Sequence, residues 1–194
     1  MAVAGTLLGD WSGLDVSGQL LRHTASLPAA LAFMVPLLGV CYYGVSAADR
    51  DPGFGELKRV FQESLIPQME ALPGWGLCLL SLGAGVGEET LFRAFLQTAA
   101  IGSIQGAAPA LAPAAATAAG VAVTSLGFAA LHALTPTYFA FAFGASILFG
   151  VEYCACGLQS AALTHWLYDW CALVYILSQW GSSGGGGGKQ PSAT

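Results

Sequence analysis

The chain has 194 residues, of which 55% are hydrophobic and only 9% are charged. Soluble domains carry about 25% charged residues, so this composition excludes an ordinary soluble domain and indicates a protein of the lipid bilayer. The formal net charge of −5 at pH 7 comes with no cluster of Lys or Arg, which argues against nucleic acid as a partner. The five cysteines lie in apolar segments, where we expect thiols rather than a disulfide framework.

The chain begins with a short segment before its first apolar stretch. Residues 1–26 mix Gly, Asp and Leu around Trp11 and predict at most a short interfacial segment. Leu27–Val45 is then apolar and about long enough to cross a bilayer, for which a helix needs about 20 residues. Tyr42 and Tyr43 lie where an interfacial aromatic belt would sit. We therefore expect the first span at 27–45.

The segment from Ser46 to Pro73 is rich in charge and predicts a different kind of helix. Apolar residues recur in it at helical spacing, opposite charged and amide side chains. These apolar positions are Leu57, Val60, Phe61 and Leu65. We expect an amphipathic helix lying on the membrane surface. The basic residues Arg50, Lys58 and Arg59 favour the cytoplasmic or stromal side for this loop.

Four more apolar segments follow, and each predicts a membrane span. They are Trp75–Ile101, Leu111–Leu134, Tyr138–Leu158 and Ala161–Trp180. The interval Ala94–Val151 contains no Asp, Glu, Lys or Arg, which leaves room for two spans of about 20 residues. The predicted fold class is therefore all-α, a transmembrane bundle of about five spans plus the amphipathic helix, over residues 27–180. The Gly/Ser-rich tail, residues 181–194, is predicted to be disordered.

Three ionisable side chains interrupt the second of these spans, in the motif Gly-Glu-Glu-Thr-Leu-Phe-Arg at residues 87–93. At a bilayer centre each charge would cost about 2.5 to 3.5 kcal/mol, so these groups should face protein or a water-filled cavity and mark a site. Glu89 and Arg93 lie four residues apart on one helix face and predict a structural ion pair. Glu88 lies about 100° further around the helix, which leaves it available for proton transfer.

Two other predicted spans contribute polar groups at helical spacing. Phe128-Ala-Ala-Leu-His132 lies in the third, and His165-Trp-Leu-Tyr-Asp169 in the fifth places His165 and Asp169 on one face. A lone intramembrane His is more often a packed, hydrogen-bonded residue. Three polar segments together favour a site, because each group needs compensation in lipid. We therefore expect Glu88, His132, His165 and Asp169 to converge.

Two further polar residues stand apart from this set. His23 precedes the first span and is predicted to be a surface residue. Glu152 lies near the middle of the fourth span, where we expect a structural hydrogen-bond partner rather than a catalytic group.

At these positions the chain resembles the CPBP family of intramembrane proteases, which includes type II CAAX prenyl endopeptidases and bacteriocin-processing proteins. Glu-Glu-x-x-x-Arg at 88–93, Phe-x-x-x-His at 128–132 and His-x-x-x-Asp at 165–169 are similar to its three motifs, and the resemblance covers about residues 75–177. Many members have Asn where this chain has Asp169. Members usually carry more spans before the core, so the resemblance implies a minimal or truncated member.

The resemblance implies an intramembrane endopeptidase acting on a peptide or a prenylated protein. Glu88 and His132 would activate a water, while His165 and Asp169 would position it or stabilise the oxyanion. Two His and a Glu also form a plausible zinc set, and the family has been read both as metal-dependent and as glutamate-dependent without metal. A divalent metal such as zinc thus stays open as a cofactor, and no metal ligand is assigned.

The alternative from another class is a non-catalytic scaffold or assembly factor of the same fold in a larger membrane complex. Its polar cluster would then serve as internal struts, since a fold does not establish an activity. Retention of every motif residue favours catalysis, whereas the short N-terminal region favours the scaffold. A transporter has little support, because five spans without an evident inverted repeat do not fit one. We expect an integral membrane protein; the sequence does not identify the membrane, and the plastid and the endoplasmic reticulum are both compatible with it.

Overall fold

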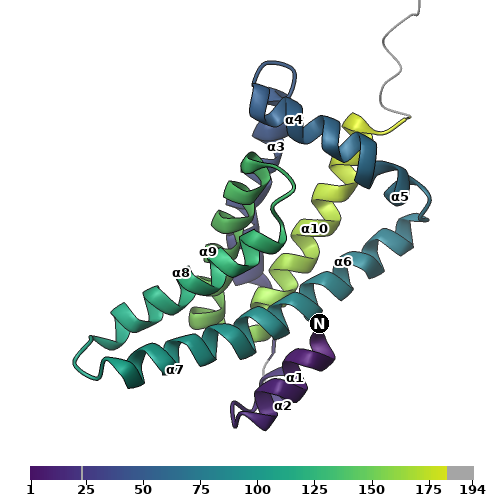
Figure 1. Cartoon of the computed structure of the whole chain (residues 1–194). Helices are drawn as coiled ribbons and strands as arrows, with labels where there is room; N and C mark the ends of the chain where they lie inside the picture. Colours follow the sequence, from purple (N-terminus) through teal and green to yellow (C-terminus); the bar gives the residue numbers. More distant parts are fainter. Residues whose placement is uncertain (23, 183–194) are drawn as a thin grey trace, which may run out of the picture.

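The computed structural model describes residues 1–22 and 24–182, which form helices and no strand and so confirm the all-α class. His23 and tail residues 183–194, for which a surface position and disorder were predicted, lie outside the described residues. Figure 1 shows the bundle. In chain order the elements are α1 (Ala2–Trp11), α2 (Val16–Arg22), α3 (Leu27–Ala47), α4 (Pro52–Val60), the π-helix η1 (Phe61–Leu65), α5 (Ile66–Glu70), α6 (Gly74–Glu89), the π-helix η2 (Thr90–Gln97), α7 (Thr98–Ala107), α8 (Pro113–Leu131), α9 (Pro136–Cys156) and α10 (Leu158–Trp180).

The number of membrane spans differs from the prediction of about five. Within the described residues, three helices are long and apolar enough to cross a bilayer, namely α3, α8 and α9. The stretch from Gly74 to Ala107 is bent by 114° against Pro52–Glu70, and a fourth span results when this pair is counted as one. Helix α10 has 23 residues but carries His165 and Asp169, which lower its hydropathy. The predicted number of spans is therefore approximate, because the polar residues of the site lower the hydropathy of the helices that contain them.

Helix α10 runs through the bundle and packs against α6, α3 and α9 (Figure 1). Its contact with α6 is close at Gly85, where an added Cβ would lie 2.8 Å from the carbonyl oxygen of Ala162 and 2.8 Å from the backbone nitrogen of Trp166. Small residues allow helix backbones to approach in this way. The crossing brings the end of α6, with Glu88 and Glu89, beside the middle of α10.

Gly85→Ala is expected to destabilise the protein by about 1 to 3 kcal/mol, because the new methyl group would push two helix backbones apart. Gly83→Ala is the matched control, since nothing lies within 4 Å of a Cβ at that position. The control should be neutral or stabilising by up to about 1 kcal/mol, the helix propensity that Ala gains over Gly. Thermal unfolding in detergent measures both, and equal melting temperatures would contradict the close approach.

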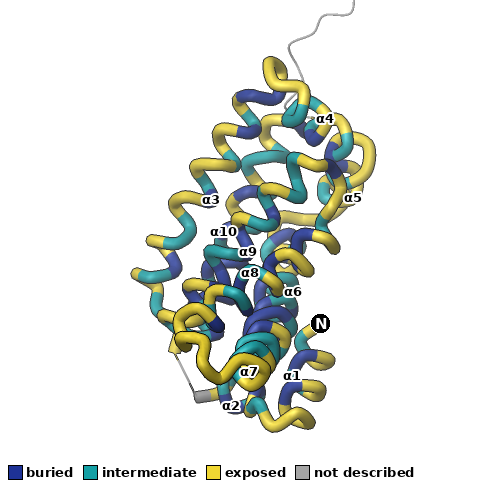
Figure 2. The backbone as a smooth tube through the Cα atoms, turned by 60° about the vertical axis from the view of Figure 1, so that its left-hand side comes forward, coloured by how far each residue is buried: buried dark blue, intermediate teal, exposed yellow. Residues whose placement is uncertain are grey.

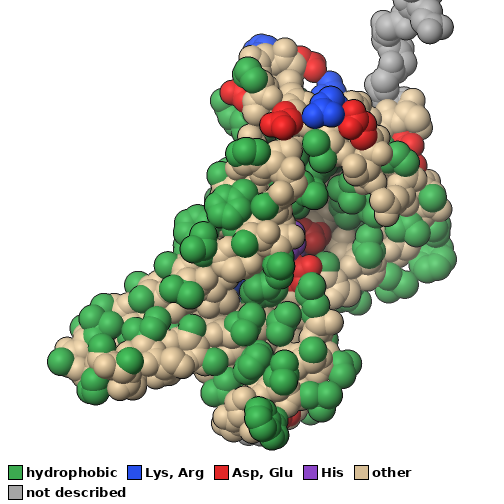
Figure 3. Space-filling view, viewed as in Figure 1, with side chains coloured by type: hydrophobic (Ala, Val, Ile, Leu, Met, Phe, Trp, Pro, Cys, Tyr) green, Lys and Arg blue, Asp and Glu red, His purple; other side chains and the backbone are tan. Residues whose placement is uncertain are grey.

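The predicted amphipathic helix forms in three pieces, α4, η1 and α5, and its apolar side packs on the protein. Its buried residues form a cluster with Ala48 after α3 and Trp180 at the end of α10: Ala48, Leu57, Phe61, Ile66 and Trp180. Gln62 Nε2 also donates to the carbonyl oxygen of Trp180 at 3.1 Å. Charged side chains gather on the outer side of this segment, at the top of Figure 3. The apolar stripe thus fixes α4 to α5 over the end of α10.

The outer faces of the bundle keep large apolar side chains exposed, and Figure 2 shows exposed residues along α3. Val35 is 66% exposed and Val123 is 61% exposed. Exposed apolar surface of this kind marks contact with a membrane. The protein is an integral membrane protein.

The N-terminal segment, expected to be interfacial at most, forms α1 and α2. Helix α1 packs on η2, where a Cβ on Gly5 would lie 2.9 Å from the Cα of Leu91.

Candidate active site

A cavity of about 240 Å³ lies between α6, α8, α9 and α10, with η1 on one side. Its lining includes all four residues predicted to converge, Glu88, His132, His165 and Asp169. Figure 3 shows a hollow in the surface with acidic and histidine side chains at its base. The remaining walls are mostly apolar, so the few polar groups face a space that is otherwise suited to an apolar ligand.

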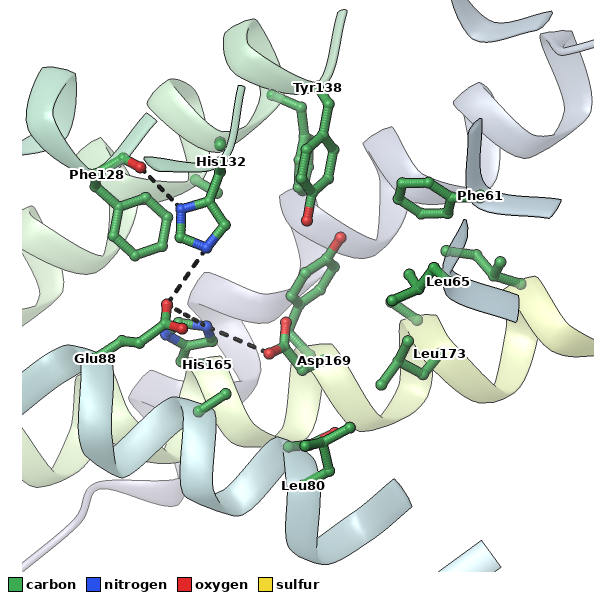
Figure 4. A pocket seen from close by; sticks show the side chains of 18 of the residues that line it. Phe61, Leu65, Leu80, Glu88, Phe128, His132, Tyr138, His165, Asp169 and Leu173 are labelled. Carbon is green, nitrogen blue, oxygen red and sulfur yellow. Dashed lines mark hydrogen bonds and ion pairs between the residues drawn. The ribbon is translucent and has the colours of Figure 1, made fainter. Parts of the chain in front are cut away.

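Glu88 and His132 face each other across this cavity (Figure 4), with His132 Nε2 3.6 Å from Glu88 Oε2. His132 Nδ1 lies 2.8 Å from the carbonyl oxygen of Phe128. A carbonyl only accepts, so Nδ1 carries the hydrogen and donates it. The tautomer is thereby fixed, and Nε2 is the nitrogen available for exchanging a proton in the cavity.

The position of His132 differs from the sequence prediction, which placed it within a span. Helix α8 ends at Leu131, and His132 follows as its C-cap with φ −108°. Its ring still stacks on Phe128, with centroids 4.2 Å apart. Thr135 then caps α9, since its Oγ1 accepts from the backbone nitrogen of Tyr138 at 3.1 Å. The short turn between the two helices therefore holds the imidazole at the edge of the cavity.

His165 is oriented by Glu89, a contact that sequence reasoning missed. Its Nδ1 lies 2.9 Å from Glu89 Oε1, while Glu89 Oε2 accepts from Arg93 Nε at 2.9 Å. The ring of His165 also stacks on Phe149 at 4.5 Å. A carboxylate paired with Arg is an acceptor, so Nδ1 is the donor and Nε2 faces the cavity. Glu89 thus connects Arg93, its ion-pair partner, to His165 of the candidate site.

The cavity side of His165 meets two carboxylates, as the dashed lines of Figure 4 show. Nε2 lies 3.4 Å from Asp169 Oδ2 and 4.0 Å from Glu88 Oε2. The pair His165 and Asp169 is four residues apart on α10, at the spacing expected for one helix face. The site therefore gathers three carboxylates around one imidazole, with Arg93 as the nearby permanent cation.

Arg93 is fully buried and makes contacts with three helices. Besides Glu89, it donates from Nη2 to Ser146 Oγ on α9 at 2.9 Å, and its guanidinium carbon lies 5.5 Å from the centre of the Phe128 ring on α8. Thr98, the first residue of α7, donates from its hydroxyl to the Arg93 carbonyl at 3.1 Å. The ion pair forms although the segment after Glu89 is the π-helix η2. Wide turns of this kind often occur at functional sites.

Glu152 lies outside the lining of the cavity. It is fully buried on α9 and accepts a hydrogen bond from Thr164 Oγ1 at 2.7 Å. This contact ties α9 to α10 next to His165. The arrangement fits the structural hydrogen-bond partner that the sequence predicts for this residue.

The possibility of a metal ion depends on the arrangement of the donors. Zinc takes nitrogen and oxygen ligands at about 2.0 to 2.2 Å from one point. Among residues 1–22 and 24–182, no group of three or more His, Cys, Asp and Glu is arranged to hold a metal ion. The imidazole Nε2 atoms of His132 and His165 lie 3.6 Å and 3.4 Å from carboxylate oxygens of Glu88 and Asp169. No metal ligand is therefore assigned among these residues.

Several lining residues were not singled out from the sequence. Ser81 and Tyr138 are single hydroxyls in apolar spans, a pattern that carries no signal of its own. The amphipathic segment also contributes three apolar side chains to the cavity wall: Phe61, Leu65 and Met69. The apolar spacing of Phe61 and Leu65 predicted a helix lying on the membrane surface and did not predict that this helix would border a cavity.

The part of the chain that contains this site matches a known protein family. Residues 70–171, more than half of the chain, match the family described as type II CAAX prenyl endopeptidase Rce1-like. No match was found among curated proteins or solved structures. The matched range contains the four candidate residues and the Glu89–Arg93 ion pair, which agrees with the resemblance seen in the three motifs. The chain therefore belongs to the Rce1-like family of type II CAAX prenyl endopeptidases, a family of CAAX-type intramembrane proteases.

Proposed function

We propose that the protein is an intramembrane endopeptidase that hydrolyses a peptide bond within the C-terminal CAAX motif of a prenylated protein, with a water activated by Glu88 and His132. The observation that carries this proposal is the meeting of Glu88 Oε2 and His132 Nε2 in one cavity at 3.6 Å. A water bound to both atoms would lie within reach of two proton acceptors.

In the proposed reaction, the water gives a proton to the Glu88–His132 pair as its oxygen attacks the carbonyl carbon of the substrate. The same proton then passes to the amide nitrogen as the carbon–nitrogen bond breaks. One water is consumed, and the products are an amine and a carboxylic acid, which releases its remaining proton to solvent and becomes a carboxylate. No covalent enzyme intermediate is needed, since the nucleophile is the water itself.

His165 and Asp169 are proposed to position the water or the substrate carbonyl. Glu89 holds His165 by Nδ1, so its Nε2 keeps a fixed direction toward the cavity. Buried Arg93 and Phe149 support this arrangement from behind. An orienting carboxylate behind an imidazole is a recurring device of hydrolases. Asp169 can donate to an oxyanion only in its protonated form, because an ionised carboxylate repels one.

The apolar walls of the cavity support a substrate with an apolar portion. Leu80, Leu173 and Ile176 line it from α6 and α10, and Phe61 and Leu65 line it from η1. A prenyl group buries hydrocarbon against such surfaces and gains about 0.8 kcal/mol for each CH₂ removed from water. We therefore expect a prenylated peptide to bind more tightly than the same peptide without the prenyl group.

We further propose that hydrolysis proceeds without a metal ion. The donor arrangement supports this, since the imidazole nitrogens face carboxylates. Cleavage by the purified protein should keep its rate in the presence of a strong chelator of zinc. A rate that falls with the chelator and returns on addition of zinc would contradict this part of the proposal.

The proposed function is tested with purified protein in detergent or nanodiscs, incubated with a CAAX peptide in prenylated and unprenylated form. The prenylated peptide should be cleaved, with a kcat/KM well above that of the unprenylated one. The control is Glu88→Ala, which should leave both peptides intact. A folded wild-type protein that cleaves neither peptide would instead favour the non-catalytic scaffold.

A further inference from the structure

Tyr138 presents its hydroxyl to the cavity from α9, and its ring is held on three sides. Figure 4 shows the hydroxyl pointing into the space in front of Asp169 and His132. The ring lies edge-on to Phe61 with centroids 5.5 Å apart, and its centroid is 6.1 Å from Phe141 and 6.4 Å from His132. Packing of this kind orients an aromatic side chain and leaves its polar tip directed at one point.

Within the part of the chain that the structure describes, no hydrogen bond involves the Tyr138 hydroxyl. Tyrosine hydroxyls in buried positions usually find a partner. The second tyrosine of this cavity, Tyr168, interacts electrostatically with the thiol of Cys41. The Tyr138 hydroxyl instead lies within electrostatic reach of the Asp169 and Glu88 carboxylates. Its position leaves the O–H available to a molecule bound in the cavity.

Hydrolysis of an amide builds negative charge on the carbonyl oxygen, and that charge needs a hydrogen-bond donor. Among the polar groups already described, His165 is the one whose Nε2 can donate into the cavity while Glu89 holds its Nδ1, and further donors are few. Ionised Glu88 and Asp169 accept only, and His132 donates its Nδ1 hydrogen to a backbone carbonyl while its Nε2 is the proposed base. A phenol is a neutral donor and stays protonated well above neutral pH, since its ordinary pKa is about 10.

We infer that Tyr138 donates a hydrogen bond to the substrate carbonyl oxygen and stabilises the oxyanion of the tetrahedral intermediate. This inference rests on the proposed peptidase function and adds one residue to it. The site then has a division of labour: Glu88 and His132 activate water at one side, and Tyr138 binds the developing oxyanion at the other. A neutral donor suits a site that already contains three carboxylates.

Tyr138→Phe tests the inference, because it removes one oxygen atom and keeps the ring packing. Loss of one oxyanion donor lowers kcat by about 10²-fold, and KM should change by less than about twofold, since the bond strengthens in the transition state. Tyr153→Phe is the matched control. Its hydroxyl contacts Thr98 and Gln19, and it does not line the cavity, so its kcat should stay within about twofold of wild type.

A binding measurement separates an oxyanion contact from a structural effect. A phosphonate analogue of the CAAX peptide mimics the tetrahedral intermediate and should bind Tyr138→Phe at least about tenfold more weakly than wild type, because such analogues use transition-state contacts. The cleaved peptide product should bind both proteins equally. A variant that loses affinity for product and analogue alike would overturn the inference.

The two proposals fail in different ways. An active wild type whose Tyr138→Phe variant keeps kcat within about twofold would overturn the role of Tyr138 and leave the peptidase in place. A wild type that cleaves no CAAX peptide and does not bind the phosphonate would overturn both.

Discussion

Replacing Glu88 by Gln is expected to lower kcat for cleavage of a prenylated CAAX peptide by at least about 10³-fold while leaving the fold intact. Gln matches Glu in shape, but its amide cannot take a proton from water. Glu88 has no Arg or Lys partner among the described residues, so its loss leaves no buried cation uncompensated. Steady-state kinetics on the purified variant, with its melting temperature, measures the effect.

Glu152→Gln is the matched control for this experiment. Glu152 is also a glutamate within the bundle, but it bonds Thr164 and does not line the cavity. Its amide oxygen can still accept from the Thr164 hydroxyl, so kcat should remain within about threefold of wild type. A Glu88→Gln variant that keeps more than a tenth of the wild-type kcat, or a Glu152→Gln variant that falls equally far, would contradict a specific role for Glu88.

The second large effect is on stability. Arg93→Ala is expected to reduce the free energy of unfolding by about 3 to 5 kcal/mol, because removing one partner of a buried pair leaves the other charge without compensation. Both Arg93 and Glu89 are 0% exposed, and the guanidinium also bonds Ser146 on α9. Denaturant unfolding in detergent measures the loss, which should appear with or without substrate.

Arg59→Ala is the corresponding control on the surface. Arg59 pairs with Glu63 at 3.2 Å, also four residues apart, but the two side chains are 62% and 59% exposed. Exposed pairs of this spacing contribute about 0.3 to 0.5 kcal/mol. If Arg59→Ala and Arg93→Ala lost the same stability, burial would not be what makes the inner pair strong.

The positions of the long apolar helices could be predicted from the sequence because lipid requires long, uninterrupted apolar segments. Leu27–Val45 was predicted as the first span and α3 covers Leu27–Ala47. A surface helix followed by a span also implied a change of direction near Pro73, where the structure has the 114° bend. The π-helix η2 and the packing of α4 to α5 on α10 could not be predicted in this way, because hydropathy does not report backbone pitch or contacts between distant segments.

In the candidate site too, the residues with a local sequence signal could be predicted and the contacts between distant residues could not. Glu88, His132, His165 and Asp169 stood out because ionisable groups in apolar spans need compensation, and the structure brings them to one cavity. The contact of Glu89 with His165 joins residues 76 positions apart and has no local sequence signal. Tyr138 was also missed, since a tyrosine in an apolar span is compatible with simple packing.

The most direct measurement is mass spectrometry of the products when purified protein cleaves a prenylated CAAX peptide in water enriched in ¹⁸O. Activation of water by Glu88 and His132 predicts a cleaved peptide whose new carboxylate carries one ¹⁸O after a single turnover, formed by wild type and absent with Glu88→Gln. A folded wild-type protein that yields no cleaved peptide, or a Glu88→Gln variant that yields labelled product at the wild-type rate, would contradict this mechanism.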